Sequence, residues 1–444
     1  MIAWSTFAVG GVYVWASAPL IVAAVALGAT ARPRPGVSRE TRLLDGALLV
    51  GLALVAVQLV PLPEAVRSAV SPNADPVREA LQLVPVAAAW RPLSVSAGAT
   101  AYSMALIGTA FVVFWAARQA CGRGATRSLV KAVAFIGLAA ALVAILMRSD
   151  DPRLLYGLWS PQAEGARPFG PFVNRNHYAA WVVMAFPLTA GYVAAAAGAH
   201  RPSRRLASEL AALLRGLGSS ALWAGVAGAV MILSLLTSAS RSGLMAFGAS
   251  LACGVLIGRR RLTRRARFIG FVGFAMLTVF LVAYADFQPL LLRVDETLTV
   301  GAGDRPAIWR ETMSIVEDFW LAGAGLGGFQ SVMLVYQQAD RTFFFNQAHN
   351  QYLHLLAEGG LLLAIPALVA IAAFVRLFRA RMRRDDSSSL WLRVGGAAAL
   401  IAIAVQGIWE TGLRMPANGL LFALAAAIAV HRPAEDGGLS ELDE

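Results

Sequence analysis

Long apolar runs recur along the chain and constrain its fold more than any other feature. They carry few charges, and their length of roughly 20 residues is what an α-helix needs to cross the hydrocarbon core of a bilayer. Lipid cannot hydrogen-bond an open backbone, so runs of this kind must form helices. The predicted spans are residues 4–29, 43–62, 99–117, 129–147, 177–198, 221–238, 242–257, 268–285, 351–375, 391–409 and 415–430.

Composition agrees with this interpretation. The chain is 58% hydrophobic and only 14% charged, whereas a soluble domain has about a quarter of its residues charged. The sequence therefore predicts an all-α integral membrane protein, in which residues 1–444 form one polytopic domain of about 11 or 12 helices. The count depends on residues 4–29, which form either one helix or a tight pair broken near Ser17, Ala18 and Pro19.

The net charge of +12 is explained by topology and does not indicate a nucleic-acid partner. Arginines and lysines gather in short loops between spans, as the positive-inside rule expects of cytoplasmic loops. The basic loops alternate along the chain and hold four to six of these residues each: 31–42, 116–131, 199–220, 258–267 and 376–390. The longer loops at 63–98, 148–176 and 286–348 hold three or four each, so they are predicted to lie outside the cytoplasm.

The large outer loop at 286–348 is predicted to carry an amphipathic helix. Its segment DRPAIWRETMSIVEDFW has apolar positions at helical spacing, and Pro306 suits the first turn. The segment is too short and too charged to span, so we expect it to lie on the outer surface, against the membrane or the bundle. The apolar face comprises Ile308, Thr312, Ile315, Val316, Phe319 and Trp320, with Arg310, Glu311, Ser314, Glu317 and Asp318 opposite.

Two arginines at predicted outer helix starts are candidates for anion binding. Arg241 lies in SASRSG, at the outer turn between two spans; alternatively, it is an interfacial arginine whose charge reaches the headgroups. Ser238, Ser240 and Ser242 can cap the following helix, whose first N–H groups and positive dipole end favour a phosphate. Arg305 precedes the amphipathic helix and would occupy the same kind of position.

His349 and Asn350 open the span that begins at residue 351, again on the predicted outer side. Histidine is the usual general base near neutral pH, but a histidine at a helix start can also simply bond the backbone. His354 and Glu358 are four residues apart and could pair with each other. Glu358 is about half a turn out of phase with His349 and is not expected to orient it.

Polar residues also open the predicted span at 177–198, in the segment GPFVNRNHYAAW. Amides and a histidine at an outer helix mouth could bind sugar hydroxyls. The asparagines could equally cap the helix. The candidates are Asn174, Asn176 and His177.

Other patterns predict no site. The segment GAGLGG at 323–328 fits a dinucleotide fingerprint but follows no strand, so we interpret it as a flexible turn after the amphipathic helix. His349 and His354 lack the spacing of zinc ligands, and we expect neither a metal nor another cofactor. Cys121 and Cys253 lie in different parts of the bundle, so we expect no disulfide.

Taken in order, these pieces resemble the O-antigen ligase and O-antigen polymerase superfamily of bacterial polytopic glycosyltransferases. The likeness runs over about residues 90–370, and its most specific part is the ordered trio SRSG, RPAIW and HNQYL. We therefore expect residues 221–375 to hold a ligase-related core that includes the loop at 286–348. The other matching pieces are WRPLSVSAGAT, GPFVNRNHYAAW, GAGLGGF and the LHLLAEGG that follows HNQY.

The resemblance implies roles that the residues alone only permit. Arg241 and Arg305 would bind the diphosphate of a polyprenyl-diphosphate-linked glycan donor, and His349 would activate the acceptor hydroxyl. The reaction would be an inverting, metal-independent transfer at the periplasmic face of the bacterial inner membrane, in cell-surface polysaccharide synthesis. Supporting or acceptor-binding roles would fall to Asn350, Asn174, Asn176, His177, Ser240 and Ser242.

The resemblance leaves the acceptor open. Ligases of this kind use lipid A core, polymerases use the growing glycan, and relatives use other hydroxyl acceptors. A flippase for the same lipid-linked oligosaccharide is the main alternative from another class. It would need an internal repeat and a polar cavity at mid-membrane, and the sequence indicates neither.

Overall fold

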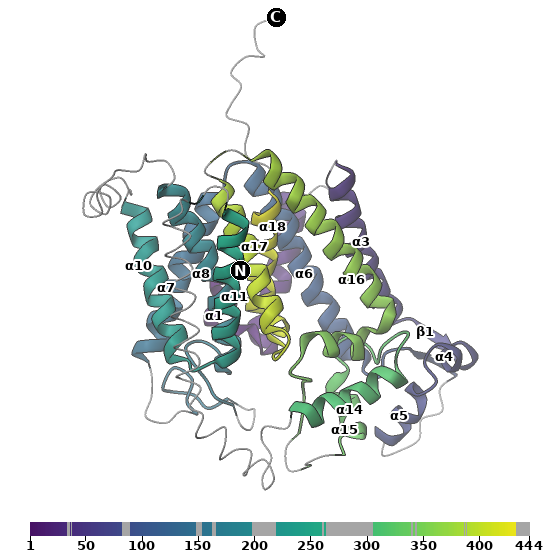
Figure 1. Cartoon of the computed structure of the whole chain (residues 1–444). Helices are drawn as coiled ribbons and strands as arrows, with labels where there is room; N and C mark the ends of the chain where they lie inside the picture. The colour runs from purple at the N-terminus through teal and green to yellow at the C-terminus, as the bar shows by residue number, and fades with distance from the viewer. Residues whose placement is uncertain are drawn as a thin grey trace, which may run out of the picture.

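The chain folds as an all-α integral membrane protein, seen here in a computed structural model (Figure 1). Among the described helices, seven are long and apolar enough to cross a membrane, and two more are apolar but shorter. The structure describes residues 1–32, 36, 38–81, 89–147, 153–161, 166–197, 219–259, 262, 305–338, 341, 344–385, 387 and 389–431.

The described helices follow the predicted spans closely after the first one. The main difference is at α16, which continues to Arg384, past the predicted end at 375. The predicted span at 268–285 and the tail after His431 lie outside the described residues. The helices at the predicted positions are α2 Val14–Ala31, α3 Arg39–Val57, α6 Ala97–Gly122, α7 Thr126–Leu146, α8 Arg175–Ala197, α10 Ser219–Thr237, α11 Arg241–Gly258, α16 Gln351–Arg384, α17 Leu390–Gln406 and α18 Pro416–Val430.

The first predicted span is a pair of helices, but the predicted position of the break is wrong. Pro19 lies inside α2, and the chain turns earlier, through α1 (Ile2–Phe7) and the 3-10 helix η1 (Val9–Gly11). Gly10 and Gly11 have φ of 67° and 75°, which glycine adopts without the steric cost other residues meet. At 1.5 Å per residue, α1 is about 9 Å long and is too short to cross a bilayer.

Helix α8 is the centre of the bundle. It packs against α7, α10, α11, α17 and α18, and its interior face is filled by side chains such as Tyr178 and Trp181. Gly191 lets α17 approach closely, because a Cβ there would lie 2.5 Å from the carbonyl oxygen of Trp391. This central helix begins at the candidate functional site described below.

Short elements cover one end of the bundle, called here the α14 end (Figure 1). Strands β1 and β2 pair antiparallel, with Leu62 opposite Arg91. The sequence did not predict the strands or the short helices α4, α5 and α15, which have too few residues for a periodic signal. The elements are β1 Pro61–Pro63, α4 Glu64–Val70, α5 Ala74–Leu81, β2 Trp90–Pro92, α14 Arg305–Asp318 and α15 Phe329–Tyr336.

The predicted amphipathic helix is α14, and its apolar face packs on protein. Ile315 and Phe319 are buried in a cluster with residues of α5, α15 and α16. Trp320 was expected on the same face but is 55% exposed, because the helix ends at Asp318. Packing of this face holds α14 against the start of α16.

Helix α16 is broken near its start, and the glycine-rich turn fills the break. Gly360 has φ 55° and ψ −161°, which interrupts the helix. Gly323 reaches the break so closely that a Cβ would lie 2.2 Å from the carbonyl oxygen of Glu358. Gly325 N–H and Gln58 Nε2 each donate to that carbonyl at 3.1 Å. The segment 323–328 is therefore a buried, hydrogen-bonded turn rather than a free one.

The described parts of three basic loops meet at the opposite end of the bundle. The start of α3 and the end of α16 both lie there, away from α14 (Figure 1). Arg118 at the end of α6 pairs with Asp45 of α3 at 2.7 Å, and Glu40 interacts electrostatically with Arg381 and Arg384. The described parts of three predicted cytoplasmic loops thus share one side. Cys121 and Cys253 are free thiols, as predicted.

Candidate functional site

Glu410 is the centre of a polar cluster at the α14 end. It lies just after α17, and its side chain is only 1% exposed. Its Oε1 accepts hydrogen bonds from Arg305 Nη2 and Asn176 Nδ2, each at 2.7 Å. His349 Nδ1 lies 3.5 Å from the other carboxylate oxygen, Oε2. A single buried carboxylate therefore connects residues that are far apart in the sequence.

Asn176 extends this cluster to α11. Its Oδ1 accepts a hydrogen bond from Ser240 Oγ at 2.8 Å, and its backbone carbonyl accepts one from Gln406 Nε2 at 3.0 Å. Ser240 also caps α11, because its Oγ accepts from Gly243 N–H. The capping predicted for the SASRSG turn is thus made by Ser240, while Ser242 lies buried in the first helical turn.

Four helices begin around this cluster. The first residues of α8, α11 and α14 are Arg175, Arg241 and Arg305, and α16 begins directly after His349 and Asn350. Each helix start carries unpaired N–H groups and a partial positive charge. An arginine at such a position opposes the helix dipole, so three of them together favour a bound anion that offsets the repulsion.

The side chains of the cluster fall into a buried group and an accessible group. Glu410 and Ser240 are buried and hold their neighbours in place. Arg241 is exposed, and the side chains of Arg305 and His349 are 39% and 32% exposed. These three accessible residues are the ones that the ordered sequence trio SRSG, RPAIW and HNQYL contributes.

His349 is held by the backbone before it. Its φ of 48° lies in the left-handed region, which is uncommon for a residue other than glycine. The preceding residue, Ala348, is held on both sides of its Cα atom. Trp309 Nε1 donates to the carbonyl oxygen of Ala348, and the N–H of Ala348 donates to His354 Nδ1. His354 Nε2 in turn lies 3.2 Å from Glu358 Oε1, as the four-residue spacing predicted.

Two predicted asparagines are helix caps. Asn350 Oδ1 accepts from the N–H groups of Tyr352 and Leu353 at the start of α16. Asn174 Oδ1 accepts from Asn176 N–H at the start of α8. The capping interpretation is confirmed for Asn174, whereas the cap made by Asn350 was not predicted. In contrast, the Asn176 side chain points to the cluster.

His177 lies inside the bundle rather than at its mouth. It is 4% exposed, and neither ring nitrogen has a hydrogen-bond partner among the described residues. Its backbone carbonyl accepts from Asn418 Nδ2 at 3.1 Å, and its ring interacts electrostatically with Glu410. It therefore lies behind the accessible surface.

Glu410 was not among the predicted site residues. A signal was present, because Glu410 is a lone carboxylate in the short break between the apolar runs at 391–409 and 415–430. A carboxylate between two apolar runs is costly to bury unless it is paired. Its partners were not predictable from spacing, since they lie 61, 105 and 234 residues away.

A family comparison agrees with this arrangement. Residues 226–368 match the family described as O-antigen ligase, a range that contains Arg241, Arg305 and His349. This central part of the chain is similar to O-antigen ligases. The resemblance found in the sequence is thereby confirmed for this range, while Asn176 and Glu410 lie outside it. No curated protein matches the chain.

The superfamily points to a ligase of glycosyltransferase type and to lipid-linked glycan substrates. Within the part of the chain that the structure describes, no group of three or more His, Cys, Asp or Glu residues could hold a metal ion. The accessible groups that the sequence predicted at this site are two guanidinium groups and one imidazole.

Proposed function

We propose that this protein transfers a glycan from a polyprenyl diphosphate to an acceptor hydroxyl, with the α14 end facing the periplasm of a bacterial inner membrane. The observation that carries the proposal is the buried Glu410, which brings Arg305 and His349 together at the start of four helices. The basic loops at the opposite end support this orientation through the positive-inside rule.

Arg241 and Arg305 would bind the donor diphosphate. Guanidinium groups match phosphate oxygens in a bidentate way, and both residues begin helices whose dipoles also favour an anion. Nη2 of Arg305 donates a hydrogen bond to Glu410, and this bond orients the guanidinium group for a ligand. In the transition state these cations stabilise the charge that grows on the leaving diphosphate.

His349 would act as the general base. Its Nδ1 faces Glu410, so Nε2 is the nitrogen available for the acceptor. The acceptor oxygen attacks the anomeric carbon, its proton passes to Nε2, and the bond between that carbon and the diphosphate oxygen breaks with inversion. Glu410 positions the ring and stabilises the imidazolium that forms.

The test is an in vitro transfer assay with a lipid-diphosphate oligosaccharide, with chelator present. We expect His349→Ala to lower turnover by about 10²–10⁴-fold while donor binding is retained, because it removes only the base. Lost donor binding would show that His349 has another role. A ladder of products would identify a polymerase, and a single addition to lipid A core a ligase.

A topology test is independent of this assay. A reporter fused after Arg341 should appear in the periplasm, because the fusion site follows α15 at the α14 end. A cytoplasmic signal would contradict the orientation. Donor movement across a vesicle bilayer without any transfer would favour the flippase.

A further inference from the structure

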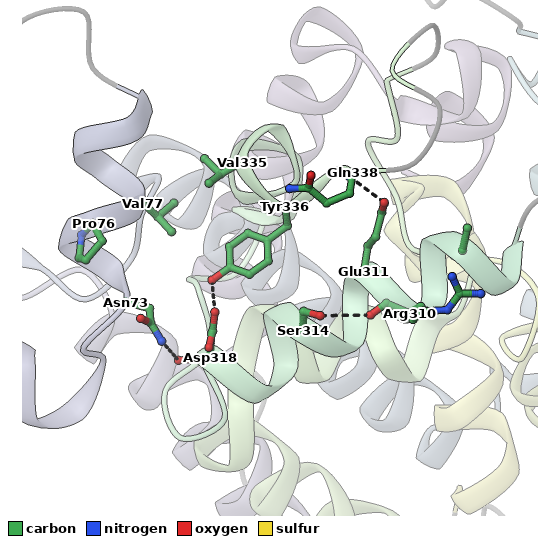
Figure 2. Close-up of a pocket in the computed structure, with 11 residues that line it drawn as sticks. Asn73, Pro76, Val77, Arg310, Glu311, Ser314, Asp318, Val335, Tyr336 and Gln338 are labelled. Atoms are coloured by element: carbon green, nitrogen blue, oxygen red, sulfur yellow. Dashed lines mark hydrogen bonds between the residues drawn. The ribbon is translucent and has the colours of Figure 1, made fainter.

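A groove of 760 Å³ lies at the α14 end and is formed by residues of α5, α14 and the end of α15 (Figure 2). None of the residues assigned above to donor binding or catalysis lines it. The lining residues are Asn73, Pro76, Val77, Ala307, Arg310, Glu311, Ser314, Asp318, Val335, Tyr336 and Gln338.

Polar groups line both walls of the groove. Tyr336 donates from its hydroxyl to Asp318, and Asn73 Nδ2 donates to the backbone carbonyl of Asp318 at 3.3 Å. Gln338 N–H donates to Glu311 Oε1 at 2.8 Å. These bonds hold both carboxylates in place, and the carboxylate of Asp318 keeps further acceptor capacity, since a carboxylate has about four lone-pair sites.

The groove combines these polar groups with apolar surface. Val77, Val335 and the ring of Tyr336 lie among them (Figure 2). Burial, together with the hydrogen bond to Asp318, raises the pKa of Tyr336, so its hydroxyl stays a donor at neutral pH. A sugar ring presents hydroxyls at its edge and C–H groups on its faces. A mixed lining of this kind matches that surface.

The charge of the groove excludes a second diphosphate site. One arginine, Arg310, lies beside the two carboxylates of Glu311 and Asp318, so the lining favours a neutral or cationic ligand. The helix starts at the Glu410 cluster carry the opposite balance, with exposed arginines around one buried carboxylate.

The position of the groove connects it to the cluster. Helix α14 begins at Arg305, and the groove extends from Ala307 to Asp318 on the same helix. At 1.5 Å per residue, these positions lie roughly 3 to 20 Å from Arg305 along the helix axis. A ligand bound near Arg305 could extend a chain of several sugars along α14.

We propose that this groove is a saccharide-binding subsite for neutral sugar units away from the bond that reacts. The proposal rests on the proposed function, because that function supplies a glycan near Arg305. The sugar units could belong to the donor glycan or to the acceptor glycan, which share the chemistry that the groove recognises.

The first experiment measures binding without the reaction. The probe is the glycan released by mild acid from the lipid-linked fraction of the producing cells, which has neither lipid nor diphosphate. Ser314 lines the groove and is exposed, so Ser314→Trp should fill the groove and weaken binding on the order of tenfold or more. Met313→Trp is the matched control, because Met313 is exposed on α14 but does not line the groove.

A second variant protects the test from a folding defect. Arg310→Ala removes one exposed polar group without adding bulk and should weaken binding by about threefold to tenfold. Equal binding of the glycan by wild type, Arg310→Ala and Ser314→Trp would overturn the proposal. Absence of binding by the wild type would overturn it as well.

The second experiment identifies the source of the sugars. Transfer is measured with donors of one and of several repeat units, and then with short and long acceptors. If KM in Ser314→Trp increases for long donors but not for long acceptors, the groove binds the donor glycan. If KM increases for long acceptors but not for long donors, the groove binds the acceptor glycan. Unchanged KM in every arm would overturn the proposal. Retained glycan binding without any transfer by wild type would contradict the proposed function alone.

Discussion

Two carboxylates at the α14 end are surrounded by basic residues in opposite ways. Asp75 of α5 is 26% exposed, and Arg67 and Arg78 pair with it at 2.7 Å while being only 3% and 8% exposed. Glu410 is 1% exposed, and its partners Arg305 and His349 are the exposed members. In the first cluster the cations face the interior, and in the second they face outward.

This difference separates a structural cluster from the proposed binding site. Arg67 also donates to Leu62 O and Arg78 to Ser94 O, so both guanidiniums use their donors to hold the loop at 63–98. The Glu410 cluster leaves donors of exposed arginines open to a ligand. Counting arginines near a carboxylate would not distinguish the clusters, whereas the exposure of each partner does.

The largest effect that can test this comparison is expected from Arg241→Lys. A lysine keeps the charge but loses the bidentate grip on a diphosphate, so transfer should fall by about 10²–10³-fold. The apparent unfolding temperature should stay unchanged, because Arg241 is exposed. Arg42→Lys, exposed at the opposite end of the bundle, is the control. Near-native turnover of Arg241→Lys would remove Arg241 from diphosphate binding.

Glu410→Gln is expected to have the next largest effect. It keeps the shape but removes the charge that orients Arg305 and His349, and hydrogen bonds to charged groups contribute about 1.5–3 kcal/mol. We therefore expect turnover to fall by roughly tenfold to a hundredfold. Steady-state kinetics would measure the loss, with exposed Glu79→Gln as the control. A loss no greater than that of the control would contradict a positioning role.

Arg78→Lys should act on stability instead. Lysine cannot reach Asp75 and the backbone carbonyls of β2 and Ser94 together, and the groups left unpaired should cost about 2 kcal/mol. Transfer per folded molecule should be unchanged. Thermal unfolding in detergent and active-site titration separate the two effects. If Arg78→Lys lost turnover without losing stability, the Asp75 cluster would belong to the functional site.

The smallest expected effect is the pH dependence of the Asp75 cluster. Burial acts to raise the pKa of Asp75, but hydrogen bonds from Arg67 and Arg78 outweigh it and lower the pKa below its usual 3.8. The ionised form thus stabilises the fold above pH of about 4, and this stability is lost as pH falls through the lower folded-state value. The stability difference between wild type and Asp75→Asn should therefore shrink in acid. A constant difference would show that charge does not cause it.

Sequence alone predicted the described spans after the first one, because bilayer thickness dictates the length of an apolar run. It placed the first break wrongly, since Pro19 is a conspicuous signal and Gly10–Gly11 is hidden in a run of small residues. It also indicated Arg241, Arg305 and His349 through local patterns at helix starts. The sequence did not indicate whether a polar side chain lies at the accessible surface or in the interior, as His177 shows.

Long-range contacts were the other limit. Glu410 has a clear role only when the ends of α8, α14 and α16 are placed around it, and no local period encodes that packing. The turn at 323–328 likewise looked free in the sequence, because its partners Gln58 and Glu358 are distant along the chain. The short elements of the loop at 63–98 also depend on such contacts.

The order of Glu410 and its partners in the sequence has a consequence for biogenesis. Arg305 and His349 are synthesised well before the residue that connects them. Until α17 is inserted and the segment after it has been synthesised, the basic groups have no common partner. A chain that stalls or is truncated before residue 410 would display Arg305 and His349 without the carboxylate that connects them, so the proposed activity requires synthesis and insertion through α17 and the segment after it.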